Sequence, residues 1–268
     1  MKATFGFIGC GNMGGALASA VAKTVSGTNM TLCDAFAEKA ETLAKACGAK
    51  TDTVQAVAET CTYIFLGVKP QGFETLFLQI APILQNRTDE FVLVTMAAGV
   101  SIEAVEKMAC CDCAVIRIMP NTPVSVGEGM ILYTANAKTT DEQLKTFVNA
   151  LSEAGALDRL PEEKIDAASA LSGCGPAFVY LFAEALADGA VECGLPRDKA
   201  NLYAAQTLLG AAKLLLTSGK HPGELKDAVC SPGGTTIAGV HALESGAFRS
   251  SAINAVTAAY EKTLKLKK

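Results

Sequence analysis

The sequence predicts an α/β fold, in which an N-terminal, doubly wound parallel sheet is followed by an all-helical C-terminal domain. Two observations support this prediction. Strand-like and helix-like segments alternate through the first 160 residues, as in chains that build a parallel sheet with crossover helices. From Pro161 onward the strand pattern disappears and only helical patterns remain. We therefore expect two domains, residues 1–160 and residues 161–268.

Short apolar runs in the first domain predict buried strands, and the stretches between them predict amphipathic helices. The predicted strands are residues 4–8, 30–33, 63–68, 91–95 and 114–119, with a further strand at 129–134. The predicted helices include residues 12–23, 35–47, 101–108 and 139–154.

The second domain is predicted to hold helices at residues 177–193, 196–218, 222–229 and 245–266. Pro196 and Pro222 stand at a first helical turn, where proline is tolerated. This half is rich in Ala and Leu, and its long apolar helix needs a cover. We expect a homodimer formed through this domain to provide that cover, with a self-contained helical bundle as the alternative.

The composition restricts the class of protein. Half of the 268 residues are hydrophobic and 19% are charged, which is typical of a well-packed globular chain. The net charge of −4 offers no basic surface, so we expect no nucleic-acid partner. No run approaches about 18 consecutive apolar residues, so we expect no membrane span. Because Met1 leads directly into a strand pattern, we expect no signal peptide and a cytoplasmic protein.

Three of the ten cysteines, Cys110, Cys111 and Cys113, crowd one loop and raise the question of a metal site. No second Cys or His pair stands at a zinc-finger spacing. We therefore expect no metal, and we interpret the other cysteines as small buried hydrophobic residues.

A glycine-rich loop follows the first predicted strand. Gly9, Gly11 and Gly14 form Gly-x-Gly-x-x-Gly, and a helix is predicted to begin at Asn12. In this position the glycines let the turn close, let the backbone approach a pyrophosphate and let the helix pack on the sheet. A plain glycine-rich turn is the alternative. We interpret the loop as the nicotinamide-dinucleotide site of a Rossmann-type domain, in which these residues contact the cofactor: Ile8, Gly9, Cys10, Gly11, Asn12, Met13 and Gly14.

Asp34 stands 20 residues past Gly14, at the end of the second predicted strand. An acidic side chain there accepts a hydrogen bond from the ribose 2′-hydroxyl and repels a 2′-phosphate. No Arg follows Asp34, although Lys39 is near enough in sequence to reach a phosphate. Asp34 therefore favours NADH, with NADPH left open. A helix N-cap role for Asp34 is an equal and compatible alternative.

Three further segments are expected at the same edge of the sheet, because ligands of open parallel sheets bind outside the carboxyl ends of the strands. The first is Val68-Lys69-Pro70 and the second is Ala97-Ala98-Gly99, for which ordinary turns are the alternative. The third, residues 117–123, contains Asn121 in a proline-bounded turn that we expect to face the nicotinamide.

Two Gly/Ser-rich loops, residues 171–176 and 230–236, interrupt the helical half, each before a helix. Backbone N–H groups and hydroxyls at a helix N-terminus suit a small carboxylate, while a well-capped helix connection is the alternative. The only histidines, His221 and His241, have no Asp partner in a motif. Reduction of a carbonyl usually needs a positioned acid, whereas an imine can arrive already protonated.

These segments together resemble pyrroline-5-carboxylate reductase along essentially the whole chain. The resemblance includes the Gly9–Gly14 loop and the segments at residues 68–71, 97–99, 117–123 and 172–177. The most specific segment is Asp-Ala-Val-Cys-Ser-Pro-Gly-Gly-Thr-Thr-Ile at residues 227–237, which is similar to the family's signature.

The resemblance implies hydride transfer from NAD(P)H to the C=N carbon of 1-pyrroline-5-carboxylate, giving L-proline in the final step of proline biosynthesis. It implies that Thr236 is the catalytic residue and hydrogen-bonds near the ring nitrogen. It further implies an interlocked homodimer, often assembled into decamers. The Asn-Arg that some members carry after the second strand is absent at Asp34-Ala35, so the resemblance leaves the choice of NADPH or NADH open. The residues implied to bind the substrate are Ser231, Gly233, Gly234, Thr235 and Thr236.

Two other classes of protein share parts of this pattern. A 3-hydroxyacid dehydrogenase of the related two-domain type needs a catalytic Lys and Asn, but Val179 and Ala183 stand at those positions. A cofactor-binding regulator without turnover would keep Gly9–Gly14 but has no need of the loop at residues 231–236.

Overall fold

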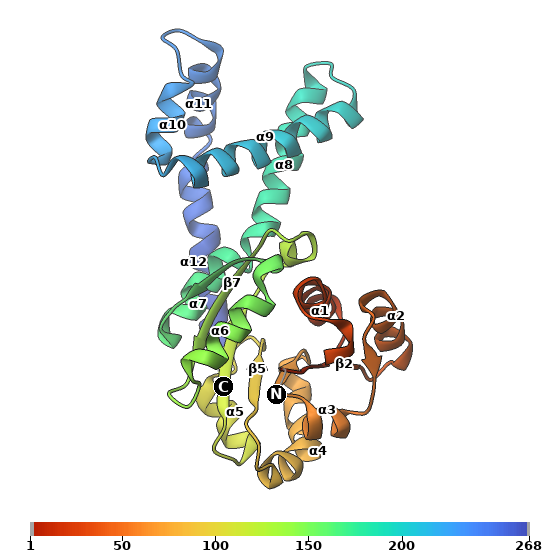
Figure 1. Cartoon of the computed structure of the whole chain (residues 1–268). Helices are drawn as coiled ribbons and strands as arrows, with labels where there is room; N and C mark the ends of the chain where they lie inside the picture. Colours follow the sequence, from red (N-terminus) through yellow and green to blue (C-terminus); the bar gives the residue numbers. More distant parts are fainter. Residues whose placement is uncertain (1–2, 267–268) are drawn as a thin grey trace. The chain divides into compact units, whose positions relative to one another are not determined.

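The computed structural model describes residues 3–266. The ends of both predicted domains, residues 1–2 and 267–268, lie outside the described residues. The chain divides into two compact units, which are described separately: the first runs through Cys174 and also takes in the chain from Ala259 onward, and the second is Gly175–Ala258 (Figure 1).

The first unit is built on one eight-stranded sheet, with the strand order β3-β2-β1-β4-β5-β6-β7-β8. Strands β1 to β6 are parallel, β7 is antiparallel to β6, and β8 is parallel to β7. The order reverses between β2-β1 and β4, which is the switch point of a doubly wound sheet. The strands are β1 (Phe5–Ile8), β2 (Met30–Cys33), β3 (Lys50–Thr51), β4 (Tyr63–Leu66), β5 (Val92–Thr95), β6 (Ala114–Met119), β7 (Gly129–Ala135) and β8 (Gly155–Arg159).

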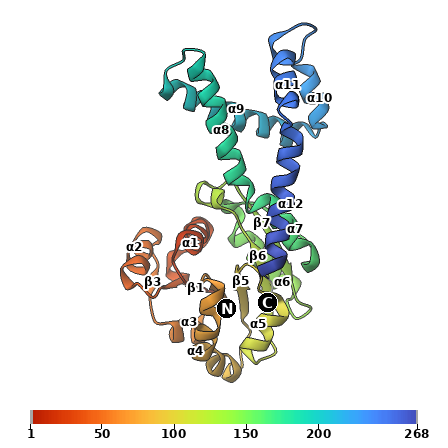
Figure 2. The same ribbon diagram turned by 180° about the vertical axis from the view of Figure 1, so that it is seen from behind.

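Helices cover both faces of this sheet because its strands are apolar on both sides. Alternate strand residues point to opposite faces, so Phe7 and Phe65 join one core while their neighbours Ile8 and Leu66 join the other. The first core is covered by α1, α2 and α6, and the second by α3, α4 and α5 (Figures 1 and 2). The α-helices within this unit are α1 (Asn12–Thr24), α2 (Ala37–Cys47), α3 (Val54–Thr60), α4 (Phe73–Asn86), α5 (Ile102–Ala109), α6 (Asp141–Ala150) and α7 (Glu162–Ser172).

The predicted α/β fold class is confirmed, and the differences are two strands that the sequence does not predict, β3 and β8, and the extent of the first unit. The helix predicted over 139–154 ends at Ala150, and β8 follows at Gly155–Arg159, where no strand was predicted. The first compact unit also runs on past residue 160, because α7 packs on β7 and buries Ile165 and Asp166.

The second unit consists of helices, as the sequence predicts (Figure 2). Its buried core is small and is centred on Ala187, Ala200 and Ala204, where α8 packs against α9. Large apolar side chains stay exposed in the single chain, among them Leu181 at 68% and Leu216 at 84%. The helices are α8 (Gly175–Glu192), α9 (Arg197–Ser218), α10 (Pro222–Ala228), α11 (Thr235–Ser245) and α12 (Phe248–Leu266), the last of which continues into the first unit.

One helical stretch, Glu162–Glu192, is long and apolar enough to cross a membrane by length and composition alone. A single such helix is weak support for a membrane span, because an apolar helix that packs against other helices passes the same test. The exposed apolar surface of α8 is explained equally well by helix–helix association.

Candidate functional site

The glycine-rich loop between β1 and α1 is closely packed against its neighbours. Gly9 adopts φ +104°, which an L side chain rarely tolerates, and its N–H donates to the Cys33 carbonyl oxygen at 2.8 Å. A Cβ atom at Gly14 would overlap the Gly9 carbonyl oxygen. At Gly11, by contrast, a Cβ would meet nothing within 4 Å, so the loop leaves open space beside this residue. Gly9 and Gly14 are thus required by the backbone of the turn, whereas the approach of a pyrophosphate at Gly11 stays a prediction.

The first turn of α1 is suited to an anion. Its N-cap is Gly11, and among the residues that the structure describes no side chain caps this helix end. The first turn also carries no acidic residue that would repel a negative charge. The leading N–H groups of a helix have no partner within the helix, and the helix dipole adds a partial positive charge there. The backbone N–H groups of Asn12 and Met13 are therefore available to an anion, which is the setting predicted for a pyrophosphate.

Asp34 lies directly after β2. Its carboxylate accepts backbone hydrogen bonds from the glycine-rich loop and from the segment that leads into α2. Its Oδ2 accepts the N–H of Cys10 at 2.6 Å, and its Oδ1 accepts the N–H of Phe36 at 2.9 Å. The N-cap of α2 is Phe36, so the alternative that Asp34 is the N-cap is wrong. Asp34 instead joins the end of β2 to the centre of the glycine-rich loop.

A cavity of about 210 Å³ opens beside Asp34, between the ends of β2 and β3 and the start of α2. Three carboxylates line it, from Asp34, Glu41 and Asp52, and none of its described lining residues is Lys or Arg. The Lys39 ammonium lies 4.9 Å from the centre of the Phe36 ring, in a cation–π contact. This cavity is therefore electrostatically unfavourable for a phosphate.

The loops after β4 and β5 lie at the same edge of the sheet as the glycine-rich loop. Ile8 is paired with Leu66 and Leu66 with Thr95, so the segments that follow these strands are neighbours. Gly67 touches the Gly9 backbone, and Val68-Lys69-Pro70 continues from it with Lys69 and Pro70 exposed. In the second loop Ala97 is buried, Ala98 is exposed and Gly99 adopts φ +75°.

Asn121 follows β6 at this edge, but its side chain is engaged within the protein. The residue is 9% exposed, its Nδ2 donates to the Ser172 carbonyl oxygen at 3.0 Å, and its Oδ1 accepts the Met130 N–H at 2.8 Å. Asn121 thus links β6, β7 and the end of α7. Its contact with the nicotinamide stays a prediction.

The loop at residues 231–236 belongs to the second unit and precedes α11. Gly234 is the N-cap of α11 without a side-chain cap among the described residues, and its N–H donates to the Ser231 carbonyl oxygen at 3.0 Å. Gly233 adopts a positive φ, and Thr235 and Thr236 form the first turn with exposed side chains. The five residues predicted to hold a carboxylate are therefore gathered around one helix N-terminus, where N–H and hydroxyl donors are available.

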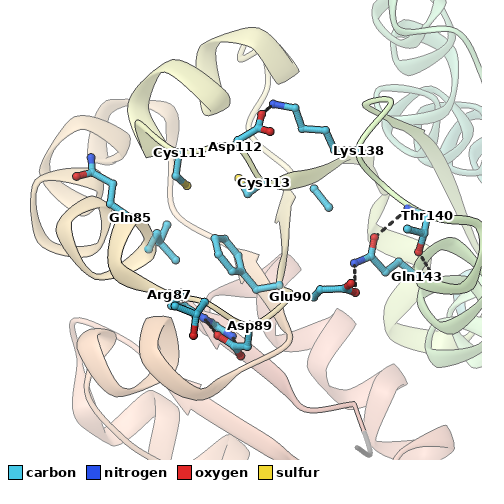
Figure 3. A pocket seen from close by; sticks show the side chains of 14 residues that line it. Gln85, Arg87, Asp89, Glu90, Cys111, Asp112, Cys113, Lys138, Thr140 and Gln143 are labelled. Carbon is cyan, nitrogen blue, oxygen red and sulfur yellow. Dashed lines mark hydrogen bonds and ion pairs between the residues drawn. The ribbon is translucent and has the colours of Figure 1, made fainter.

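A second cavity lies at the opposite edge of the sheet, where β5 and β6 begin (Figure 3). It measures about 380 Å³ and is lined by charged side chains that already have partners: Arg87 with Asp89, and Lys138 with Asp112. Cys113 also lines it, and burial raises the pKa of this thiol. Its place at the amino ends of the strands separates it from the predicted cofactor edge.

Sequence reasoning missed several residues of the site. Gly67 forms the close contact with Gly9, and a glycine directly after an apolar run is the signal that points to it. Glu41 and Asp52 line the cavity beside Asp34. Arg117 forms a buried ion pair with Asp166 at 2.7 Å, across 49 positions of the sequence, and no local pattern predicts that pair.

An open α1 N-terminus behind a Gly-x-Gly-x-x-Gly turn, with an acidic residue after β2, defines a Rossmann-type nicotinamide-dinucleotide oxidoreductase with a helical second domain. Comparison with known proteins supports this class. Residues 4–99 match the family model "NADP oxidoreductase coenzyme F420-dependent", and residues 162–266 match "Pyrroline-5-carboxylate reductase dimerisation". The chain belongs to the pyrroline-5-carboxylate reductase family, as the sequence predicts.

Individual relatives match over nearly their full length. The chain is 41% identical to pyrroline-5-carboxylate reductase 3 of Danio rerio, over 97% of this chain and 90% of the relative. It is 37% identical to pyrroline-5-carboxylate reductase of Escherichia coli (strain K12), over 100% of both.

Two solved structures share the fold at 30% sequence identity. The reductase of Coxiella burnetii gives a TM-score of 0.91 over 100% of both chains. The pyrroline carboxylate reductase of Plasmodium falciparum, solved with NADP bound, gives a TM-score of 0.86 over 100% of this chain and 99% of the other.

Proposed function

We propose that this protein reduces 1-pyrroline-5-carboxylate to L-proline with NADH or NADPH, the final step of proline biosynthesis. The observation that carries the proposal is full-length identity of 37% to a protein of this activity, together with a family match that includes the loop at residues 231–236. The 3-hydroxyacid dehydrogenase alternative lacks its catalytic pair at Val179 and Ala183.

The residues of the first unit fit a dinucleotide. The N–H groups of Asn12 and Met13 bind the pyrophosphate, the space beside Gly11 admits it, and Asp34 accepts from the adenosine ribose. When bound, the reduced nicotinamide supplies the hydride. The loops at residues 68–70 and 97–99 border it at the carboxyl edge of the sheet.

The residues of the second unit bind the substrate, 1-pyrroline-5-carboxylate. The backbone N–H of Gly233 and the hydroxyls of Ser231 and Thr235 bind the carboxylate, while Gly234, whose N–H is bonded to the Ser231 carbonyl oxygen, holds the loop around it. Thr236 hydrogen-bonds at the ring nitrogen and orients the C=N bond. Two electrons arrive with the hydride at the imine carbon, the C=N π pair moves to nitrogen, and the nitrogen keeps the proton with which it arrived. No His or Lys acid is needed for this balance.

We propose further that the enzyme prefers NADH. A ribose 2′-phosphate placed beside Asp34 would face the carboxylates of Glu41 and Asp52 as well, and like charges at this distance repel. Lys39, the cation that the sequence offers for such a phosphate, is engaged with the Phe36 ring. The match to the family model "NADP oxidoreductase coenzyme F420-dependent" and the bound NADP of the Plasmodium falciparum protein make NADPH the coenzyme to compare.

We propose that the protein works as a cytoplasmic homodimer formed through the second unit, with a decamer as a further assembly, and that neither nucleic acid nor membrane is a partner. The exposed apolar side chains of α8 and α9 and the match to a dimerisation family support the dimer. All ten cysteines are free thiols, which favours a reducing compartment.

The test is coenzyme oxidation that depends on added 1-pyrroline-5-carboxylate. We expect turnover with this imine, and Thr236→Ala should lower kcat about 10- to 100-fold, the range for one lost hydrogen bond to the reacting group, while the Kd of the coenzyme stays unchanged. Thr217→Ala is the control, because this hydroxyl donates to the Lys213 and Leu214 carbonyls within α9. Oxidation of a hydroxyacid without activity on the imine would overturn the proposal.

A further inference from the structure

A buried arginine joins the sheet to α7. Arg117 lies in the middle of β6 and is 2% exposed. Its Nη2 donates to Asp166 Oδ1 at 2.7 Å and its Nη1 donates to Glu162 Oε1 at 3.1 Å. Glu162 and Asp166 are four residues apart on α7, so both carboxylates lie on one helix face and reach the same guanidinium. We call these three residues the Arg117 cluster.

The Arg117 cluster also holds the start of α5. The same Glu162 oxygen that accepts from Arg117 accepts the backbone N–H of Ile102 at 2.9 Å. Ile102 is the first residue of α5 and is 6% exposed, so its N–H has neither a helical partner nor free access to water. A side chain from another helix thus caps α5, in addition to its own N-cap Ser101.

The segment that ends at Ile102 is the loop after β5, which contains Ala97-Ala98-Gly99. One end of this loop is fixed by Thr95 in the sheet, where Thr95 pairs with Leu66 and Arg117. The other end is fixed by the bond from Ile102 to Glu162. The shape of the loop therefore depends on a carboxylate 60 residues further along the chain.

A gain in stability does not explain why the Arg117 cluster is charged. Taking an arginine and an aspartate out of water costs free energy that their attraction only offsets, and apolar side chains of the same volume usually stabilise a core as well or better. What apolar side chains cannot do is offer one oxygen atom to two donors from different elements. The Arg117 cluster therefore fixes the position of α7 against β6, and it fixes the position of α5 against α7 and β6.

We infer that Glu162, oriented by Arg117 and Asp166, is a positioning residue for coenzyme binding: it sets the loop at residues 96–101 that borders the nicotinamide half. This inference rests on the proposed function for the identity of the coenzyme-dependent reaction. Glu162 touches neither coenzyme nor substrate and acts through Ile102.

The experiment compares Glu162→Ala and Glu162→Gln with the control Glu163→Ala. Glu163 is exposed in the same first turn of α7, so its removal changes helix charge without touching the loop. Glutamine keeps an oxygen for the Ile102 N–H but lacks the charge, whereas alanine removes both. The Kd of NADH and NADPH is measured by fluorescence in the absence of any imine, and kcat and KM are measured with 1-pyrroline-5-carboxylate.

For Glu162→Ala we expect coenzyme Kd to rise about tenfold, in keeping with one lost hydrogen bond to a charged group, and kcat to fall. Glu162→Gln should show a smaller change and Glu163→Ala none. Hydrogen exchange at the backbone of residues 96–104 should be faster in Glu162→Gln than in the wild type. If Glu162→Ala does not fold, the same measurements on Glu162→Gln and Glu163→Ala test the inference.

Lower thermal stability with unchanged coenzyme Kd, kcat and loop exchange would overturn the inference and leave the cluster a merely structural one. If the wild type does not reduce the imine, the proposed function fails, while the coenzyme Kd and exchange measurements still decide the role of Glu162.

Discussion

The Asp34 carboxylate accepts the backbone N–H of Cys10 at 2.6 Å, and this bond ties the end of β2 to the middle of the glycine-rich loop. Its other oxygen accepts the Phe36 N–H at 2.9 Å. Each carboxylate oxygen has two lone pairs, so Asp34 has capacity left for a ribose hydroxyl. A substitution here consequently alters both the loop and the recognition of the ribose.

We expect Asp34→Asn to lower the ratio of kcat/KM for NADH to that for NADPH about tenfold. Removing the charge weakens acceptance from the 2′-hydroxyl and reduces repulsion of a 2′-phosphate, and a hydrogen bond to a charged group accounts for a change of this size. Steady-state kinetics with both coenzymes gives the ratio. Glu41→Gln lines the same cavity without touching the loop and should change the ratio less. An equal effect of Asp34→Asn on both coenzymes would show that Asp34 serves the loop alone.

Substitutions of two glycines in the loop should separate an effect on protein stability from an effect on coenzyme binding. We expect Gly14→Ala to destabilise the protein, because the new Cβ overlaps the Gly9 carbonyl oxygen, which is backbone and cannot move aside. Gly11→Ala should leave the melting temperature unchanged, since its Cβ meets nothing in the protein, yet should raise coenzyme Kd more than about tenfold by occupying the space of the pyrophosphate.

Thermal unfolding and coenzyme titration of both variants distinguish these effects. Gly15→Ala is the control, because its Cβ would lie 3.3 Å from the Cys10 carbonyl oxygen, a tight contact that a small shift relieves. A Gly11→Ala protein that binds the coenzyme normally would place the pyrophosphate elsewhere.

The sequence predicts the central strands well because their signal is local. Residues of β1, β2, β4 and β5 are buried on both faces, which produces continuous apolar runs that can be recognised without knowledge of the fold. Strand β8 gives no such signal, since Gly155–Arg159 is half-buried or exposed and is held in place by pairing with β7. Only the tertiary contact makes it a strand.

The difference between local signals and tertiary contacts also decides which residues of the candidate site the sequence predicts. Gly9, Gly14 and Asp34 follow from a motif whose spacing has one geometric reason, and the structure places them together. The sequence predicts Asn121 at the cofactor edge because this residue follows β6. In the structure its side-chain amide is hydrogen-bonded to Ser172 and Met130. Such long-range partners are chosen by the packing of α7 on the sheet and leave no trace in local sequence.

Cys10 should resist alkylation at neutral pH although it lies in the cofactor loop. Burial and the neighbouring Asp34 carboxylate raise the pKa of this thiol from its ordinary 9.0 to about 12. Because only the thiolate reacts, a rise of this size lowers the rate at pH 8 about 1000-fold. Iodoacetamide labelling followed by peptide mass spectrometry measures this rate against that of the exposed Cys110. Equal labelling of both thiols would contradict the environment found for Cys10.

The raised pKa of Cys10 also gives the sign of a pH effect. In the unfolded chain the thiol loses its proton near pH 9, whereas in the folded protein it keeps it until about pH 12. The contribution of this group to stability is complete below pH 9 and is lost as pH rises from 9 to 12. Cys10→Ser should therefore flatten the fall in the free energy of unfolding over that window, as urea denaturation at several pH values would show.

The Arg117–Asp166 pair predicts a loss of stability that depends on the fragment. Residues 1–174 retain both partners, so Arg117→Met takes the guanidinium from the buried Asp166 carboxylate and should destabilise this fragment by about 3–5 kcal/mol. Residues 1–160 lack Asp166 and Glu162 and open Arg117 to water, so Arg117→Met should change the stability of this fragment little.

Urea unfolding followed by circular dichroism measures both differences, and solubility ranks the fragments where one does not refold. The difference distinguishes the ion pair from packing within the sheet, since a lost packing contact there would make Arg117→Met destabilising in both fragments. The longer wild-type fragment should also be the more stable one, because α7 buries Ile165 and Asp166 against the first unit. Equal stability of the two wild-type fragments would mean that the first unit folds without α7 and would support the predicted domain boundary after residue 160.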